Sequence, residues 1–167
     1  MPDYRRAWCP GGTDFFTVNA LQRRGNDLLV RHIEVLRDVV RQVRKAHPFR
    51  IHGWAVLPDH LHCVIELPPE ETDFAVRWRL IKAHFSKRLP AVERRSAVRL
   101  ARGERGLWQR RYWEHRIRDD ADFGAYGLCA FQPGETWPCG SGGRLAVFHI
   151  PPPGGQWGVC LGLGREE

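Results

Sequence analysis

The sequence predicts an α+β domain in which an antiparallel sheet carries helices on one face. Two segments repeat apolar residues at helical spacing and place basic residues on the opposite side. Two apolar runs, 49–57 and 60–67, are separated only by Pro58-Asp59, a tight link that is typical of an antiparallel pair. Further strand-like runs precede the first helical segment and follow the second, so strands and helices alternate along the chain.

The first strand and the first helix occupy the N-terminal third of the chain. The turn pair Gly11-Gly12 introduces a β-rich run at 13–19. Asn26 or Asp27 can cap a helix that runs to about Ala46, shortly before Pro48. Apolar residues recur along this helix at intervals of three and four, which is the pattern of a half-buried helix: Leu29, Ile33, Leu36, Val40 and Val43.

The middle of the chain repeats the pattern with two strands and a helix. Strands are expected at 49–57 and 60–67, the latter followed by Pro68-Pro69. Asp73 can cap a second helix to about Leu89, and an Arg-rich linker at 91–105 leads to a fourth strand at 107–117. The order β-α-β-β-α-β is the ferredoxin-like pattern, with both helices on one face of the sheet.

The composition changes near residue 123. Residues 1–123 hold 24 of the 26 Lys and Arg residues and 16 of the 19 Asp and Glu residues. The last 44 residues instead contain 11 Gly and 5 Pro, including Pro151-Pro152-Pro153-Gly154-Gly155, and show almost no periodicity. We therefore predict one folded domain at 1–123 and an irregular Gly/Pro-rich tail at 124–167.

The charge and the cysteine content narrow the class of protein. A net charge of +7 and a pI near 9.6 favour a polyanionic partner. The five Cys residues form no Cys-x-x-Cys pair, which argues against a disulfide framework and against a zinc ribbon. Because the sequence has no membrane-length apolar run and no apolar signal-peptide core, we expect a cytoplasmic protein that does not associate with membranes.

His60 and His62 form the strongest candidate site. One residue apart in a strand, they project from the same face, while Leu61 points into the core. Two imidazoles fixed side by side can hold one divalent metal ion and leave positions open for substrate. A hard ion such as Mg²⁺ or Mn²⁺ there would polarise a phosphodiester oxygen. Glu66, Glu114 or a residue after Ile117 could supply a third ligand.

Basic residues interleave with aromatic residues in three places, which favours single-stranded or hairpin nucleic acid. Arginine binds phosphate, and aromatic rings stack on unpaired bases. Trp78 lies on the apolar stripe and is expected in the core. The basic residues predicted to bind DNA are Arg5, Arg6, Arg77, Arg79, Lys82, Arg110 and Arg111.

Residues 4–123 resemble the REP-associated tyrosine transposases, which belong to the single-tyrosine HUH superfamily. The resemblance rests on five motifs: Tyr4-Arg5-Arg6, Gly11-Gly12-Thr13, Trp54-Ala55-Val56-Leu57-Pro58-Asp59-His60-Leu61-His62-Cys63, Arg77-Trp78-Arg79-Leu80-Ile81-Lys82 and Trp108-Gln109-Arg110-Arg111-Tyr112-Trp113-Glu114-His115. It implies that His60 and His62 bind Mg²⁺ or Mn²⁺. It also implies hairpins of repetitive extragenic palindromes as substrates, attack on a phosphodiester by a Tyr on a following helix, and a monomer or homodimer.

The resemblance stops where the nucleophilic Tyr would be. The family pattern implies a helix with Met-Asp-Tyr followed by Phe-Asn-Pro-Val-Lys-His-Gly, but Cys129 falls at about the Tyr position. Tyr126, three residues earlier, is the remaining candidate nucleophile, and Gly124 and Gly127 beside it disfavour a firm helix. Strand cleavage is therefore expected to be impaired, since loss of a covalent nucleophile removes the reaction and leaves binding.

The genetic code offers a cause for this departure. Residues 126–129 can be encoded TAT GGA TTA TGC, which reads Met-Asp-Tyr one base later. Residues 131–137 can likewise be encoded so that the same shift yields Phe-Asn-Pro-Val-Lys-His-Gly. Our hypothesis is a single-base insertion or deletion near codons 124–126 that puts the C-terminal part out of frame.

Two other functions stay open at this point. One is a non-catalytic nucleic-acid-binding remnant or hairpin-binding repressor, which would need no nucleophile. The other is a metal-dependent RNA-processing nuclease that uses water, with His60 and His62 as ligands. A covalent protein–DNA adduct would distinguish the transposase chemistry from the nuclease.

Overall fold

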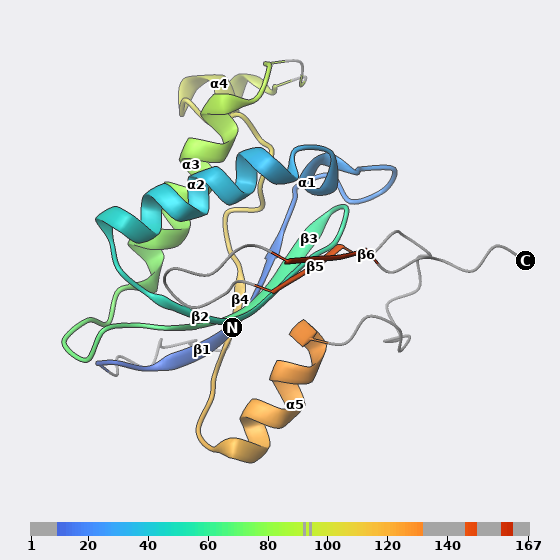
Figure 1. Ribbon diagram of the computed structural model, residues 1–167. Helices are drawn as coiled ribbons and strands as arrows, with labels where there is room; N and C mark the ends of the chain where they lie inside the picture. Colours follow the sequence, from blue (N-terminus) through green and yellow to red (C-terminus); the bar gives the residue numbers. More distant parts are fainter. Residues whose placement is uncertain (1–9, 92, 94, 132–145, 150–157, 162–167) are drawn as a thin grey trace, which may run out of the picture.

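The computed structural model describes residues 10–91, 93, 95–131, 146–149 and 158–161, with side chains up to Tyr126. Its centre is an antiparallel sheet in the order β4-β1-β3-β2-β5-β6 (Figure 1). The strands are β1 (Thr13–Asn19), β2 (Arg50–Val56), β3 (His60–Glu66), β4 (Trp113–Arg116), β5 (Ala146–His149) and β6 (Gly158–Leu161).

The order of the first four strands confirms the predicted ferredoxin-like arrangement. β3 lies between β1 and β2 and pairs antiparallel with both, so β1 and β2 run parallel with one strand between them. Pro58-Asp59 links β2 to β3, and the Leu57 amide donates to the His60 carbonyl at 2.8 Å to close the turn. A register shift between Ile51 and Gly53 bends β2 at its start.

Both predicted helices form on one face of the sheet. The first is divided at His32 into α1 (Leu28–Arg31) and α2 (Ile33–Ala46), and the second is α3 (Phe74–Arg88). Asp73 caps α3 by accepting from the Ala75 and Val76 amides, as predicted. At α1 the N-cap residue is Asp27, but the side chain that accepts from a first-turn amide is that of Asn26, whose Oδ1 accepts from the Leu28 amide at 3.0 Å. The linker before β4 contains one short helix, α4 (Ala97–Ala101).

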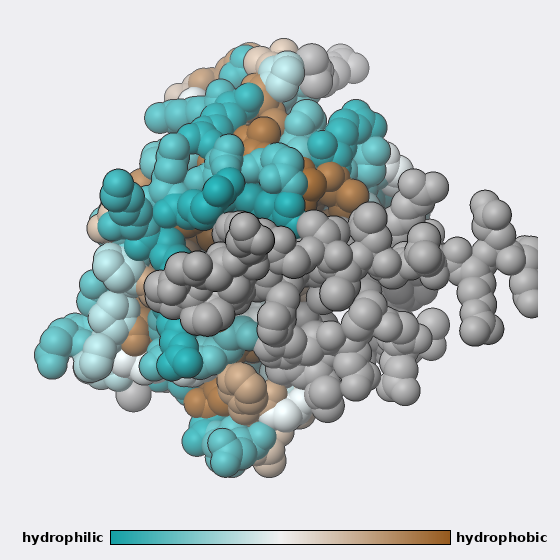
Figure 2. All heavy atoms as spheres, viewed as in Figure 1, coloured by the Kyte–Doolittle hydropathy of each residue, from teal (hydrophilic) through white to brown (hydrophobic). Residues whose placement is uncertain are grey.

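One continuous apolar core joins the helical layer to the sheet. Phe16 and Val18 of β1 are fully buried and belong to the same cluster as Leu61 of β3. Trp78 of α3 contacts the Phe16 ring at a centroid distance of 5.5 Å, which places α3 over the centre of the sheet. Hydrophilic residues cover most of the visible outer surface of this helical layer (Figure 2).

The predicted fourth strand is only partly extended. Trp108 forms an isolated bridge with Ala20, and regular pairing with β1 resumes only at β4. Between these points Lys82 of α3 donates to the carbonyl oxygens of Gln109 and Arg110 at 2.9 and 3.5 Å. The Lys82 ammonium therefore takes backbone acceptors that a continuous strand would offer to β1.

Beyond residue 123, where an irregular tail is predicted, the structure describes one helical segment and two short strands. Helix α5 (Asp120–Phe131) continues through Gly124, and β5 and β6 extend the sheet beyond β2. Helix propensity is a weak local preference that tertiary packing overrides. Here the Tyr126 ring packs on Phe15 at 5.2 Å, and α5 lies against β2 and β3 on the face opposite α2 and α3 (Figure 1).

In the part of the chain that the structure describes, every helix is too short or too polar to cross a membrane.

Candidate functional site

His60 and His62 lie on the sheet face opposite α2 and α3, as their spacing predicts. Leu61 between them is completely buried in the core. The two imidazole rings approach edge to face, with 4.9 Å between their centroids. β3 is a central strand, so its neighbours on both sides hold the pair in place: His62 lies opposite Thr17 of β1 and Ala55 of β2.

Each imidazole is oriented through its Nδ1 atom. His60 Nδ1 lies 2.6 Å from Asp59 Oδ1, and His62 Nδ1 lies 2.9 Å from Thr17 Oγ1. An oxygen acceptor on Nδ1 fixes the tautomer whose Nε2 carries a lone pair, the arrangement found around metal-binding histidines. The donor set therefore fits a divalent ion bound by the two Nε2 atoms.

The charges around the pair favour neutral imidazole at His62. Burial lowers the pKa of His62 to about 4, and the positive charges of His60 and Arg23 act in the same direction. Burial alone would raise the pKa of Asp59, but hydrogen bonds from His60 and Arg23 outweigh it and lower that pKa. A neutral His62 beside an ionised Asp59 is the protonation state that metal binding requires.

Neither glutamate suggested as a third ligand reaches the pair. Glu114 lies opposite Phe16 in the β1–β4 register, which puts it on the helical face of the sheet. Glu66 lies on the same face as His62 but about 13 Å along β3, since each strand residue rises about 3.3 Å. Its Oε2 is 2.7 Å from His52 Nε2. Within the described residues no group of three or more metal-ligating side chains forms.

Helix α5 approaches this face from the Glu66 end of β3. Phe123 contacts His52, which bonds to Glu66, whereas Tyr126 one turn later contacts Phe15, which lies opposite Val64. Successive turns of α5 therefore advance along β3 toward His62. Cys129 belongs to the following turn, about 4.5 Å further along the helix axis. Its side chain lies outside the described residues.

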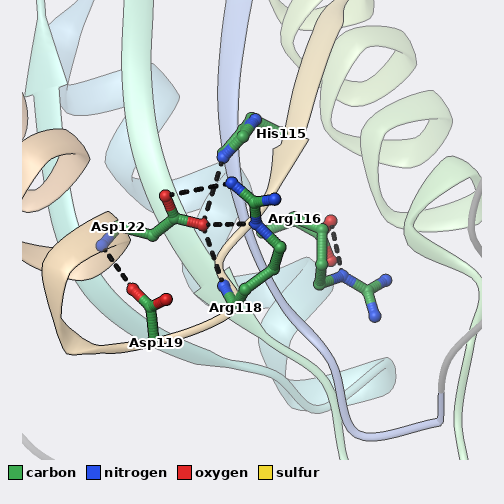
Figure 3. A network of polar contacts seen from close by, with 6 residues as sticks. His115, Arg116, Arg118, Asp119 and Asp122 are labelled. Atoms are coloured by element: carbon green, nitrogen blue, oxygen red, sulfur yellow. Dashed lines mark hydrogen bonds and ion pairs between the residues drawn. The ribbon is translucent and has the colours of Figure 1, made fainter.

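A polar network fastens the start of α5 to β4 (Figure 3). Asp122 Oδ2 accepts from Arg118 Nε at 2.9 Å and lies 3.5 Å from His115 Nε2. The hydrogen bond from Arg118 lowers the pKa of Asp122 to about 2. The ring of His115 packs on Tyr126 at a centroid distance of 4.3 Å. Tyr126 therefore sits in an aromatic cluster with Phe15, His115 and Trp113.

The predicted DNA-binding residues divide into exposed and buried groups. Arg79, Arg110 and Arg111 are exposed, and Arg110 pairs with Glu104 at 3.1 Å. Arg5 and Arg6 lie outside the described residues.

The prediction that Arg77 contacts DNA is wrong. Only 3% of Arg77 is exposed, and its guanidinium donates to the carbonyl oxygens of Asp73 and Pro48 and to Glu71. Lys82 is also largely unavailable to DNA, because its ammonium donates to the Gln109 carbonyl. Both cations hold the helical layer together.

Sequence reasoning missed the roles of two residues beside the histidine pair, Asp59 and Arg23. Asp59 was assigned only to a turn, yet it orients His60. Arg23 bonds to the other oxygen of Asp59 at 2.8 Å. Trp113, which the sequence places among the aromatic residues beside Arg110 and Arg111, lies on the same sheet face as His62 and remains 49% exposed. For Asp59, its position directly before His60 in the sequence was the available signal. No such signal existed for Arg23, because its position depends on how the loop between β1 and α1 folds back onto the turn before β3.

Comparisons with known proteins agree with this geometry. Residues 17–122 match the family model described as transposase IS200 like. A REP-associated tyrosine transposase of Escherichia coli is 41% identical over 123 residues, which are 74% of this chain and 66% of that protein. A protein of Haemophilus influenzae assigned to the same group is 38% identical over 73% of this chain and 69% of its own length. The chain thus spans about two thirds of the length of these relatives.

A solved structure gives the same result at the level of the fold. It shows a REP-associated tyrosine transposase bound to a REP hairpin, is 39% identical, and superposes with a TM-score of 0.61. The match covers 75% of this chain and 67% of that one. The family match over residues 17–122 and the identity to these relatives show that this chain belongs to the IS200-like transposase family, among the REP-associated tyrosine transposases.

Proposed function

We propose that this chain binds hairpin DNA with an unpaired arm on the face that carries His60 and His62, and that it is impaired in cutting that arm. The observation that carries the proposal is the orientation of the pair, with both Nδ1 atoms engaged and both Nε2 atoms left as metal ligands. The relative whose structure contains a REP hairpin supports the choice of DNA.

The metal would be Mg²⁺ or Mn²⁺, held by Nε2 of His60 and of His62. When bound, such an ion supplies Lewis-acid polarisation of a phosphodiester oxygen and neutralises developing charge. Thr17 and Asp59 keep the two imidazoles in the required tautomer and rotation. The exposed Arg110 and Arg111 precede β4 and can neutralise backbone phosphates, whereas Arg79 lies on α3 over the opposite face and could contact only DNA that extends around the domain.

The placement of α5 supports impaired cleavage. Tyr126 packs in the aromatic cluster on Phe15 and His115, about two strand positions short of His62. The turn of α5 that extends toward the histidine pair carries Cys129 in place of the expected Tyr. Phe15, which contacts the Tyr126 ring, also stacks on His62 at 5.5 Å, so one aromatic ring separates Tyr126 from the pair, and we expect its hydroxyl to be poorly placed for attack at the metal.

The test combines a binding assay and a cleavage assay on one labelled hairpin oligonucleotide with a single-stranded flank. We expect Mn²⁺-dependent binding by fluorescence anisotropy, and no nicked product or covalent protein–DNA adduct on a denaturing gel. Replacing both His60 and His62 by Ala should remove the Mn²⁺ dependence of binding. Failure of the unaltered chain to bind the hairpin would overturn the proposed function.

Tyr126→Phe is the matched control for the cleavage arm, because it keeps the ring and removes only the hydroxyl. If the unaltered chain forms an adduct that Tyr126→Phe abolishes, Tyr126 is a working nucleophile and the impairment is disproved. Metal-dependent cleavage of the same hairpin as RNA, with no adduct, would instead favour a nuclease that uses water.

A further inference from the structure

We propose that Arg23 is a phosphate-binding residue at the edge of the histidine site, with its guanidinium aimed by Asp59 at the backbone of the bound DNA. This inference rests on the proposed function, since it names a contact to the same DNA. It adds a residue outside every basic cluster singled out from the sequence.

The loop that carries Arg23 is tied at both ends to the turn before His60. The Ala20 amide donates to the Asp59 carbonyl at 2.8 Å, and the Leu29 amide donates to the Pro58 carbonyl at 3.2 Å. Within the loop, Asn26 Nδ2 donates to the Gln22 carbonyl at 2.7 Å. These bonds hold Arg23 beside β3, although it is 36 residues away from Asp59 in the chain.

The two carboxylate oxygens of Asp59 bind different partners, one the candidate metal-site histidine and the other the arginine. Oδ1 lies 2.6 Å from His60 Nδ1, and Oδ2 accepts from Arg23 Nε at 2.8 Å. Because Nε is the donor used, the two terminal nitrogens of the guanidinium remain available. Among the residues that the structure describes, Arg23 hydrogen-bonds to Asp59 alone.

The guanidinium of Arg23 is more accessible to solvent than the carboxylate of Asp59 that it binds. The Arg23 side chain is 50% exposed, whereas Asp59 beneath it is 17% exposed. The hydrogen bond to Asp59 uses Nε, and the half-exposed side chain leaves guanidinium donors accessible to a ligand from solvent. A planar fork fixed at Nε and open at its outer edge is suited to bidentate binding of a phosphate.

Arg24 provides a matched control. It is the next residue, is exposed, and has no hydrogen bond or ion pair within the described part of the chain. Removing either arginine changes the net charge by the same amount, so a difference between Arg23→Ala and Arg24→Ala reports on position. Arg23→Lys keeps the charge and removes the fork.

The experiment uses the full chain, Mn²⁺, and a set of hairpin oligonucleotides that each carry one uncharged methylphosphonate at a successive position of the unpaired arm. On unmodified DNA, we expect Arg23→Ala to weaken binding about tenfold and Arg24→Ala about twofold or less. At one methylphosphonate position the effect of Arg23→Ala should vanish, because the phosphate charge it contacts is already absent. Arg23→Lys should fall between the unaltered chain and Arg23→Ala.

Two results would overturn the inference. Equal effects of Arg23→Ala and Arg24→Ala on unmodified DNA would show that Arg23 contributes only general charge. A weakening by Arg23→Ala that persists at every methylphosphonate position would show that it acts through Asp59 and the fold. Failure of the unaltered chain to bind any hairpin would overturn the proposed function, and this inference with it.

Discussion

The core of the domain and the described first turns of α5, residues 120–126, are packed against the sheet in different ways. In the first region a single core joins the sheet to α2 and α3, and residues such as Phe16, Trp78 and Phe85 are at most 2% exposed. At the described start of α5, rings such as Tyr126 and the Asp122 network contact the opposite face of the sheet. The family match ends at residue 122, close to this boundary.

This difference divides the site as well as the fold. The histidine pair and the groups that orient it all lie in the first region. In the proposed function, the residue that would attack the DNA lies on α5. If the two parts contribute separate steps as proposed, DNA cleavage can be lost while DNA binding is kept.

Restoring the reading frame is the change from which we expect the largest effect. The gene, read one base later through codons 124–137, is predicted to encode Met-Asp-Tyr and Phe-Asn-Pro-Val-Lys-His-Gly. A repaired protein should nick hairpin DNA and form a covalent adduct, an increase in rate on the order of 10³-fold or more, since a missing nucleophile is restored. Gel analysis of labelled hairpin DNA measures both products.

Two controls decide whether the repaired helix is responsible. Replacing the restored Tyr by Phe should return activity to the level of the present chain, and hairpin affinity should differ little among the three proteins. A gene whose shifted frame lacks both peptides would refute the frameshift and leave the tail as a genuine variant. The boundary near residue 123 would then require another explanation.

Stability should show the same contrast between the regions. Trp78→Ala removes a side chain packed on Phe16 and Trp54, so we expect a loss of about 3–5 kcal/mol in the free energy of unfolding. Tyr126→Ala removes a half-buried ring from the outer face, for which about 1 kcal/mol is expected. Urea denaturation followed by circular dichroism compares the two. Equal losses would mean that α5 belongs to the same cooperative core.

The comparison also explains what could be predicted from the sequence. Apolar spacing of three and four placed both helices, and the Pro58-Asp59 link placed β2 beside β3, because these signals are local and packing reinforces them. α5 was missed because its few contacts, such as Tyr126 on Phe15, join positions far apart in the chain. The low helix propensity of Gly124 disfavoured a helix at this position, and long-range packing outweighed that local preference.

In the candidate site, too, local sequence signals could be predicted and long-range contacts could not. The alternation of a strand correctly put His60 and His62 on one face, whereas the partners that orient them come from other segments. Basic residues were harder to assign. Helical spacing does not distinguish an arginine exposed to solvent from one whose guanidinium is buried at the edge of the core. Arg77 was misassigned for this reason, because its guanidinium reaches the Pro48 carbonyl, 29 residues away.

Lys82 offers the smallest and most specific test of the packed region. Burial lowers the pKa of Lys82 from an ordinary 10.5 to about 8, while its ammonium donates to the Gln109 carbonyl. Between about pH 8 and pH 10.5 the unfolded chain therefore binds more protons than the folded one, so this group makes unfolding less favourable as pH rises. Lys82→Met lacks this titration. The free energy of unfolding of the unaltered chain, measured in urea relative to that of Lys82→Met, should thus increase by on the order of 1 kcal/mol across this window. Parallel pH profiles would instead show that water reaches the ammonium and that Lys82 is free to bind phosphate.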